Sequence, residues 1–86
     1  IQEIVRTYKL AIGVPEEKSR DWDKMNFSRF SKSAKKLADY FKNDYDRIAD
    51  CIEGIQKWSE KKNIDWTLET VVKRASDWEQ RRLYEN

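Results

Sequence analysis

The sequence predicts an all-α fold, a small bundle of about four helices formed by a single domain, residues 1–86. Apolar residues recur at helical spacing in four separate segments, and no segment shows the apolar–polar alternation of a strand. Glycine (2) and proline (1) are scarce, while four Trp, four Tyr and three Phe can fill a dense core. Charged residues make up 40% of the chain, which suits helices with a charged outer surface.

The first helix is expected over about residues 1–12, where Ile4 and Tyr8 belong to an apolar stripe of helical period. Gly13 can adopt the left-handed conformation that often ends a helix. Pro15 then prevents continuation, because a residue before proline avoids helical dihedral angles. We therefore expect the helix to end near Ile12.

An irregular loop is expected over residues 13–26, because this stretch shows no apolar period. Its one large apolar side chain is that of Trp22. We expect this indole to attach the loop to the core, since large aromatic side chains are seldom left uncovered. An exposed Trp22 that contacts a partner is the alternative.

The second helix is expected over about residues 27–42. Phe27, Phe30, Leu37 and Phe41 fall within one arc when successive residues are turned by about 100°. The polar residues predicted on the opposite side are Arg29, Lys32, Ser33, Lys36 and Tyr40.

The third and fourth helices are expected over about residues 44–61 and 67–83. Asp44 is a suitable N-cap for the third helix, and Gly54 is predicted to lie opposite its buried stripe. For the fourth helix the sequence leaves two candidate N-caps, Thr67 and Asp65.

The composition argues against catalysis, and we expect no enzyme, no cofactor and no metal site. The chain has no histidine, which removes the commonest general base and the commonest metal ligand. Cys51 lies next to an apolar stripe, where a free cysteine usually serves as a small core residue. The glycines do not form a phosphate-binding loop.

The remaining general features suggest a location. No apolar run approaches the roughly 18 residues of a membrane span, so we expect no membrane partner. A single cysteine cannot form an internal disulfide and fits a reducing compartment. Because the chain begins with Ile and shows no signal-peptide pattern, we expect a domain excised from a longer intracellular, cytoplasmic protein.

Charge is unevenly distributed along the chain. Residues 24–43 carry six basic residues against one Asp, a net +5, and residues 44–53 carry four acidic residues against one Arg, a net −3. The basic segment could contact phosphate groups, with affinity but little base specificity. The alternative is a solvated helix face that pairs with the acidic third helix, within one chain or across a homodimer.

Three parts of the run from Trp22 to Trp78 carry a resemblance: W-D-K-x-x-F-x-R-x-x-K-S-A-K-x-L, A-x-C-I-E and D-W-T-L-E-T-V-V-K-x-x-x-D-W. They resemble helical accessory domains at the ends of phage- and plasmid-type replication or DNA-processing proteins. The resemblance implies a non-catalytic domain attached to a larger protein that handles nucleic acid.

The leading hypothesis is a helical accessory domain that binds nucleic-acid backbone within a DNA-handling protein. Its candidate contact residues are Arg29, Lys32, Ser33, Lys35, Lys36 and Tyr40. The competing hypothesis is a protein-interaction or dimerisation module that uses complementary charged helix faces.

Overall fold

The computed structural model describes the backbone of residues 1–81 and the side chains of residues 1–80. The prediction of an all-α fold with about four helices is confirmed. The elements in chain order are α1 (Gln2–Ile12), a 3-10 turn η1 (Glu16–Lys18), α2 (Ser19–Tyr40), α3 (Tyr45–Lys62) and α4 (Leu68–Arg81). The last part of the fourth predicted helix, residues 82–83, lies outside the described residues.

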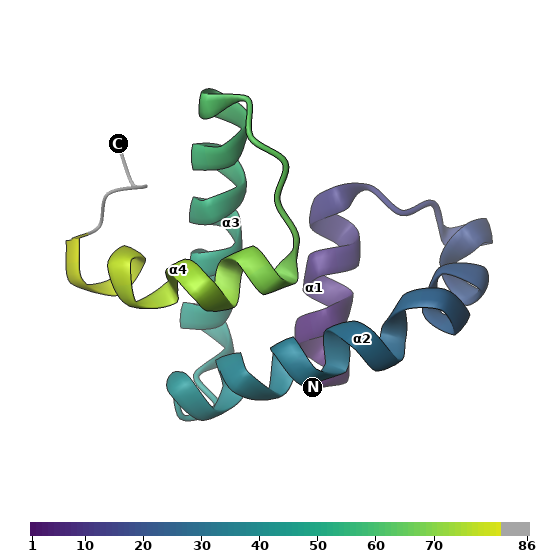
Figure 1. The fold of residues 1–86 in the computed structure, drawn as a ribbon. Helices are drawn as coiled ribbons and strands as arrows, with labels where there is room; N and C mark the ends of the chain where they lie inside the picture. Colours follow the sequence, from purple (N-terminus) through teal and green to yellow (C-terminus); the bar gives the residue numbers. More distant parts are fainter. Residues whose placement is uncertain (82–86) are drawn as a thin grey trace.

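The four helices form two layers that cross each other (Figure 1). Helices α1 and α3 lie side by side in one layer, and α2 and α4 lie across them in the other. Contacts join α1 to α3 and α2 to α4 within the layers, and α1 to α2 and α3 to α4 between them. Each helix therefore turns its apolar stripe towards the space between the layers.

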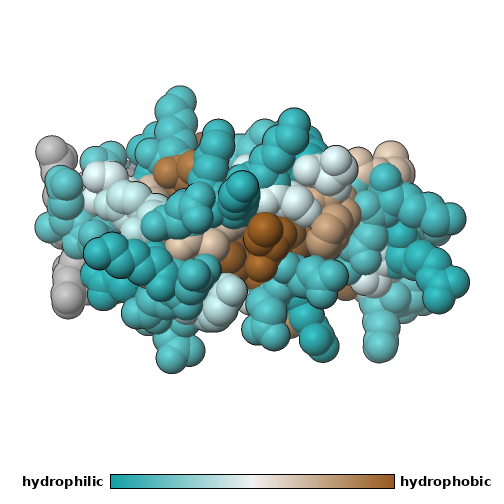
Figure 2. All heavy atoms as spheres, turned by 90° about the horizontal axis from the view of Figure 1, so that it is seen from below, coloured by the Kyte–Doolittle hydropathy of each residue, from teal (hydrophilic) through white to brown (hydrophobic). Residues whose placement is uncertain are grey.

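The core lies between these layers. Its buried apolar side chains are Ile4, Val5, Tyr8, Phe30, Ala34, Leu37, Ala38, Phe41, Ile48, Cys51, Ile52, Ile55, Leu68, Val71, Ala75 and Trp78. Figure 2 shows the molecule from below, where hydrophilic side chains cover most of the surface and surround a hydrophobic patch. The amphipathic pattern of the sequence thus accounts for the separation of core and surface.

The predicted loop over residues 13–26 is wrong for most of its length. Gly13 does end α1 in the left-handed region, with φ 76°, and its N–H donates to the carbonyl of Leu10. The chain then enters η1, and α2 begins at Ser19 instead of near Phe27.

The early part of α2 is helical because Trp22 extends its apolar stripe. Trp22 lies about two turns before Phe30, and the two rings stack with centroids 5.8 Å apart and an angle of 11° between the planes. The side-chain amide of Asn26 donates to the Trp22 carbonyl across 3.1 Å. Trp22 does pack on the core, as predicted, but from a helix. One large residue in two turns leaves no visible apolar period, which explains the error.

Side-chain caps define the starts of α3 and α4. Asp44 accepts a hydrogen bond from the Arg47 N–H at 3.2 Å, so its predicted role is confirmed. At α4 the Thr67 hydroxyl accepts from the Glu69 N–H at 3.2 Å, and the Thr70 hydroxyl accepts from the Thr67 N–H at 3.0 Å. This reciprocal pair resembles a capping box and identifies Thr67 as the N-cap.

Gly54 does not lie opposite the buried surface of α3, which corrects the sequence-based prediction. The position faces the indole of Trp78 on α4, and a Cβ atom placed there would lie 2.5 Å from Trp78 Nε1. Since real side chains do not approach so closely, the glycine is what allows this ring to rest on the backbone of α3. The prediction failed because the stripe of α3 alone does not show where α4 crosses it.

Candidate nucleic-acid interface

A depression of about 430 Å³ lies between α2 and α4. Its lining residues are Arg29, Lys32, Ser33, Lys36, Glu69 and Val72. The fold thus brings four of the six sequence-predicted residues to one place. Helix α2 supplies the basic groups, and α4 closes the other side.

Arg29 is held by a carboxylate from α4. Its Nη2 donates to Glu69 Oε1, and its guanidinium lies over the Phe30 ring, 4.8 Å from the ring centroid. The hydrogen bond to Glu69 raises the pKa of Arg29 above its already high value, so this group stays charged. Both side chains are about half exposed, so the pair is open to solvent and to competing anions. Arg29 is therefore a partly neutralised cation.

Lys32 and Lys36 differ from Arg29 in having no carboxylate partner among the residues that the structure describes. Both are exposed, and they lie one turn apart, so they project in nearly the same direction. On α4, Lys73 is exposed one turn beyond Glu69. The α2–α4 depression thus has two unpaired ammonium groups on its α2 side.

The other predicted residues occupy different positions. Lys35 is exposed but is turned by about 100° from Lys36 around the helix, and it does not line the depression. Tyr40 is 45% exposed one turn beyond Lys36, with its ring edge-on to Phe41 at a centroid distance of 4.9 Å. These two residues belong to the surroundings of the depression.

Ser33 was expected on the exposed side of the helix and is instead buried, with 6% of its surface accessible. The residue lies on the flank of α2 that meets α4, where Val72 helps to close the depression. A flank covered by a second helix cannot be distinguished from a solvated flank by the period of one helix. Ser33 is thus part of the floor and presents little surface to a ligand.

The acidic face of α3 does not neutralise the basic face of α2 within the chain. Asp46, Asp50 and Glu53 are exposed. Glu53 accepts from Lys57 of its own helix at 2.8 Å. Among the described residues, no ion pair joins α2 to α3. The intrachain form of the pairing hypothesis is therefore wrong for this part of the chain.

The structure places Cys51 in the core and not at this surface. Cys51 is fully buried, and its burial, followed by the nearby Glu79 carboxylate, raises the pKa of its thiol to about 12. Residues 1–81 contain no group of three or more acidic, cysteine or histidine side chains that could hold a metal ion. Over the same residues, none of the helices has both the length and the apolar character needed to cross a membrane.

The partner of Arg29 is the main feature that the sequence-based prediction missed. Glu69 is 40 positions away along the chain, and only the packing of α4 on α2 brings the two together.

Comparison with protein families, with curated proteins and with solved structures gave no match for this chain. The resemblance to replication and DNA-processing proteins therefore stays a prediction.

Proposed function

We propose that this chain is a non-catalytic helical domain that binds the phosphate backbone of nucleic acid through the α2–α4 depression. Lys32 and Lys36 are the principal contacts, Arg29 is a secondary contact, and Tyr40 donates from the edge. In this proposal the domain belongs to a larger cytoplasmic protein of DNA replication or processing. The observation that supports it is that the ammonium groups of Lys32 and Lys36 line one depression without a carboxylate partner among the described residues.

Phosphate is the ligand that fits this arrangement best. Exposed ammonium groups contact phosphate oxygens without a fixed geometry and supply affinity that does not depend on base sequence. The floor of the depression offers little to base edges, because Ser33 is largely buried and Val72 is apolar. The expected binding is therefore weak, tolerant of sequence and strongly dependent on salt.

Fluorescence anisotropy with a labelled duplex of about 20 base pairs, and with one of its single strands, tests the proposal. At about 50 mM salt, the Lys32→Glu/Lys36→Glu variant is expected to bind at least tenfold more weakly than the parent. The slope of log affinity against log salt should fall by about two, since two phosphate contacts are lost. The duplex and the single strand together report which form is preferred.

The matched control is Lys24→Glu/Lys35→Glu. These residues lie on the same helix, are exposed, and share a direction that differs from that of Lys32 and Lys36. The control changes the net charge by the same amount, so a general electrostatic effect would weaken both variants equally. Equal weakening would overturn the assignment to the α2–α4 depression.

The competing function, dimerisation through charged faces, makes a different prediction. Sedimentation at two protein concentrations, with and without the duplex, separates the two functions. A chain that forms dimers and does not bind either nucleic acid at low salt would refute the proposal and favour the dimerisation module.

A further inference from the structure

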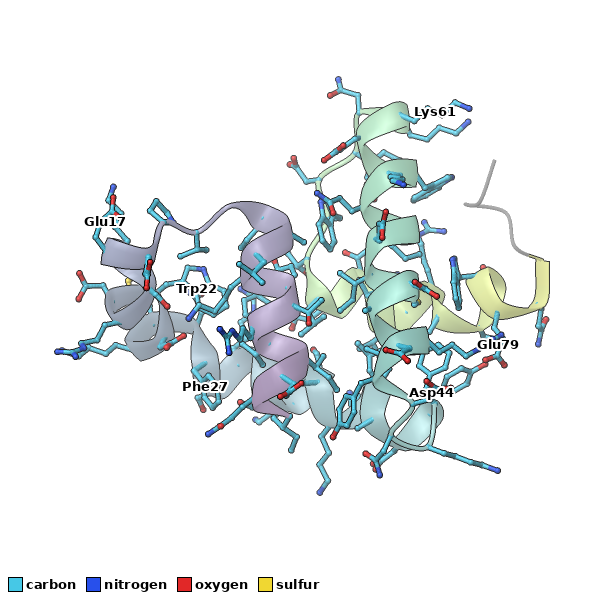
Figure 3. All side chains as sticks on the ribbon, turned by 180° about the vertical axis from the view of Figure 1, so that it is seen from behind. Glu17, Trp22, Phe27, Asp44, Lys61 and Glu79 are labelled. Carbon is cyan, nitrogen blue, oxygen red and sulfur yellow. The ribbon has the colours of Figure 1, made fainter. Side chains whose placement is uncertain are left out.

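A second surface lies on the other layer, between α1 and α3. The two helices run alongside each other in the view from behind (Figure 3). A groove of about 450 Å³ follows their contact and is lined from α1 by Thr7, Leu10 and Ala11. From α3 it is lined by Ala49, Ile52, Glu53, Gln56, Lys57 and Glu60.

The middle of the groove is apolar. Leu10 is 74% exposed on one wall, although a large aliphatic side chain is normally better covered. Ala11 and Ala49 are half-buried, and Ile52 is fully buried beneath them. Alanines at facing positions let another helix approach closely, and Leu10 offers that helix an apolar contact.

The α3 side of this groove is acidic. Glu53 and Glu60 line it, and Asp46 and Asp50 are exposed on the same helix. The one lysine among the lining residues, Lys57, is tied to Glu53 at 2.8 Å.

Glu60 accepts a hydrogen bond from Gln56, which also contacts α1. Gln56 donates through Nε2 to the Ala11 carbonyl at 2.9 Å and to Glu60 Oε1 at 3.3 Å. The Gln56 side chain thus joins the end of α1 to α3 and contacts the Glu60 carboxylate at the end of the groove. The groove therefore combines a narrow apolar centre with a negatively charged side.

We propose that the α1–α3 groove docks an amphipathic helix of a partner protein, with small and aliphatic residues in its stripe and Lys or Arg beside it. Charge complementarity defines this partner: its apolar stripe packs on Leu10 and Ala49, and its basic flank faces Glu53 and Glu60. The basic helix α2 of a second copy does not fit as well. Its large apolar side chains, Phe30 and Leu37, are already buried in its own core.

Two synthetic helical peptides of about 15 residues test the docking, each with Leu and Ala in one stripe. One peptide carries Lys on both flanks of the stripe, and the other carries Glu at the same positions. Anisotropy is expected to show binding of the Lys peptide and at least tenfold weaker binding of the Glu peptide. Equal affinity for the two peptides would overturn the proposal.

Variants of the protein separate docking in the groove from attraction by charge alone. Leu10→Gln should weaken binding of the Lys peptide by about tenfold, because an exposed apolar contact is lost. Ala49→Glu should also weaken it, because the longer side chain fills the groove. Attraction by charge alone would instead make Ala49→Glu bind more tightly, and that result would refute the groove. Leu10→Gln changes an exposed residue, so it keeps the test valid should Ala49→Glu unfold the protein.

Glu60→Lys and two controls complete the test. Glu60→Lys should shift preference from the Lys peptide towards the Glu peptide. Met25→Gln, at an 82% exposed residue outside the groove, should leave peptide binding unchanged. Lys32→Glu/Lys36→Glu should likewise leave it unchanged, so failure of this proposal is distinguishable from failure of nucleic-acid binding. Self-association of the parent that Leu10→Gln abolishes would assign the groove to a second copy and overturn the proposal.

Discussion

Helix α4 packs differently on its two neighbours. Towards α3 the contact is tight: the Trp78 indole rests on Gly54, and the Arg74 guanidinium lies 4.5 Å from the Trp58 ring centroid. Towards α2 the contact leaves the α2–α4 depression, spanned by the solvent-exposed pair of Arg29 and Glu69. Helix α4 is therefore closely packed towards α3, whereas towards α2 it leaves unpaired charge beside a depression. Three substitutions, at Trp78, Gly54 and Glu69, test this division, and a fourth, at Cys51, tests the burial of α3.

Trp78→Ala should have the largest effect. It removes a ring that is 6% exposed and contacts Phe41 edge-on with centroids 6.2 Å apart. Truncating a buried aromatic residue costs about 3–5 kcal/mol of unfolding free energy, which is a large part of the stability of a small domain. Urea denaturation followed by circular dichroism measures the loss. An effect below about 1 kcal/mol would show that the α3–α4 contact does not hold the fold together.

Gly54→Ala should destabilise the protein, although alanine favours helices by about 1 kcal/mol over glycine. The added Cβ would collide with the indole, and overpacking of this kind typically costs about 1–3 kcal/mol. The two effects together predict a lower Tm in thermal denaturation. The same change at Gly13 is a useful comparison, because its cost comes from the left-handed φ of 76° and not from a neighbour.

Cys51→Ala should reduce the fall in unfolding free energy that the parent shows as the pH rises above 9. Folding raises the pKa of this thiol from 9.0 to about 12, so between these pH values the unfolded chain releases a proton that the folded chain keeps. In the parent protein, the contribution of the protonated Cys51 thiol to the unfolding free energy is complete below pH 9 and is lost as the pH rises towards 12. Burial also raises the pKa of Tyr8, but this residue is present in both proteins, so its contribution cancels in the comparison. Chemical denaturation at several pH values compares the slopes, and identical slopes would contradict the prediction.

Glu69→Gln should have the smallest effect on stability, because the Arg29–Glu69 pair is exposed to solvent. Its effect on binding should be visible. Freeing the Arg29 guanidinium is expected to raise the affinity for the labelled duplex several-fold and to steepen the salt slope by about one. A large fall in Tm with unchanged binding would reverse the proposed division between the two sides of α4.

Much of the fold followed from local patterns in the sequence. The period of the apolar residues located four helices, and Gly13, Asp44 and Thr67 marked helix ends through the hydrogen bonds that their backbone or side chains make. The start of α2 was missed because a single tryptophan anchors its first turns to a distant tyrosine. Local pattern thus identified the elements, and long-range packing decided where α2 begins.

The candidate site was predictable only in part. The sequence located Arg29, Lys32 and Lys36 on one helix and indicated their common direction. It could not show that Ser33 is covered by α4, nor that Glu69 reaches Arg29. Both facts depend on the crossing of two helices that are far apart in the chain, and no period within either helix contains that information.

The ring of Tyr8 has centroid distances of 6.2 Å to Trp22, 5.0 Å to Phe30 and 5.4 Å to Trp66. Trp78 lies elsewhere, against Phe41 and α3. The intrinsic fluorescence of the chain consequently comes from tryptophans in separate environments, with Trp22 and Trp66 beside Tyr8 and Trp78 against Phe41. Replacing one tryptophan at a time by phenylalanine would assign its share of the fluorescence change, so that the assembly of the Tyr8 cluster and the packing of α4 on α3 are followed as separate signals during refolding.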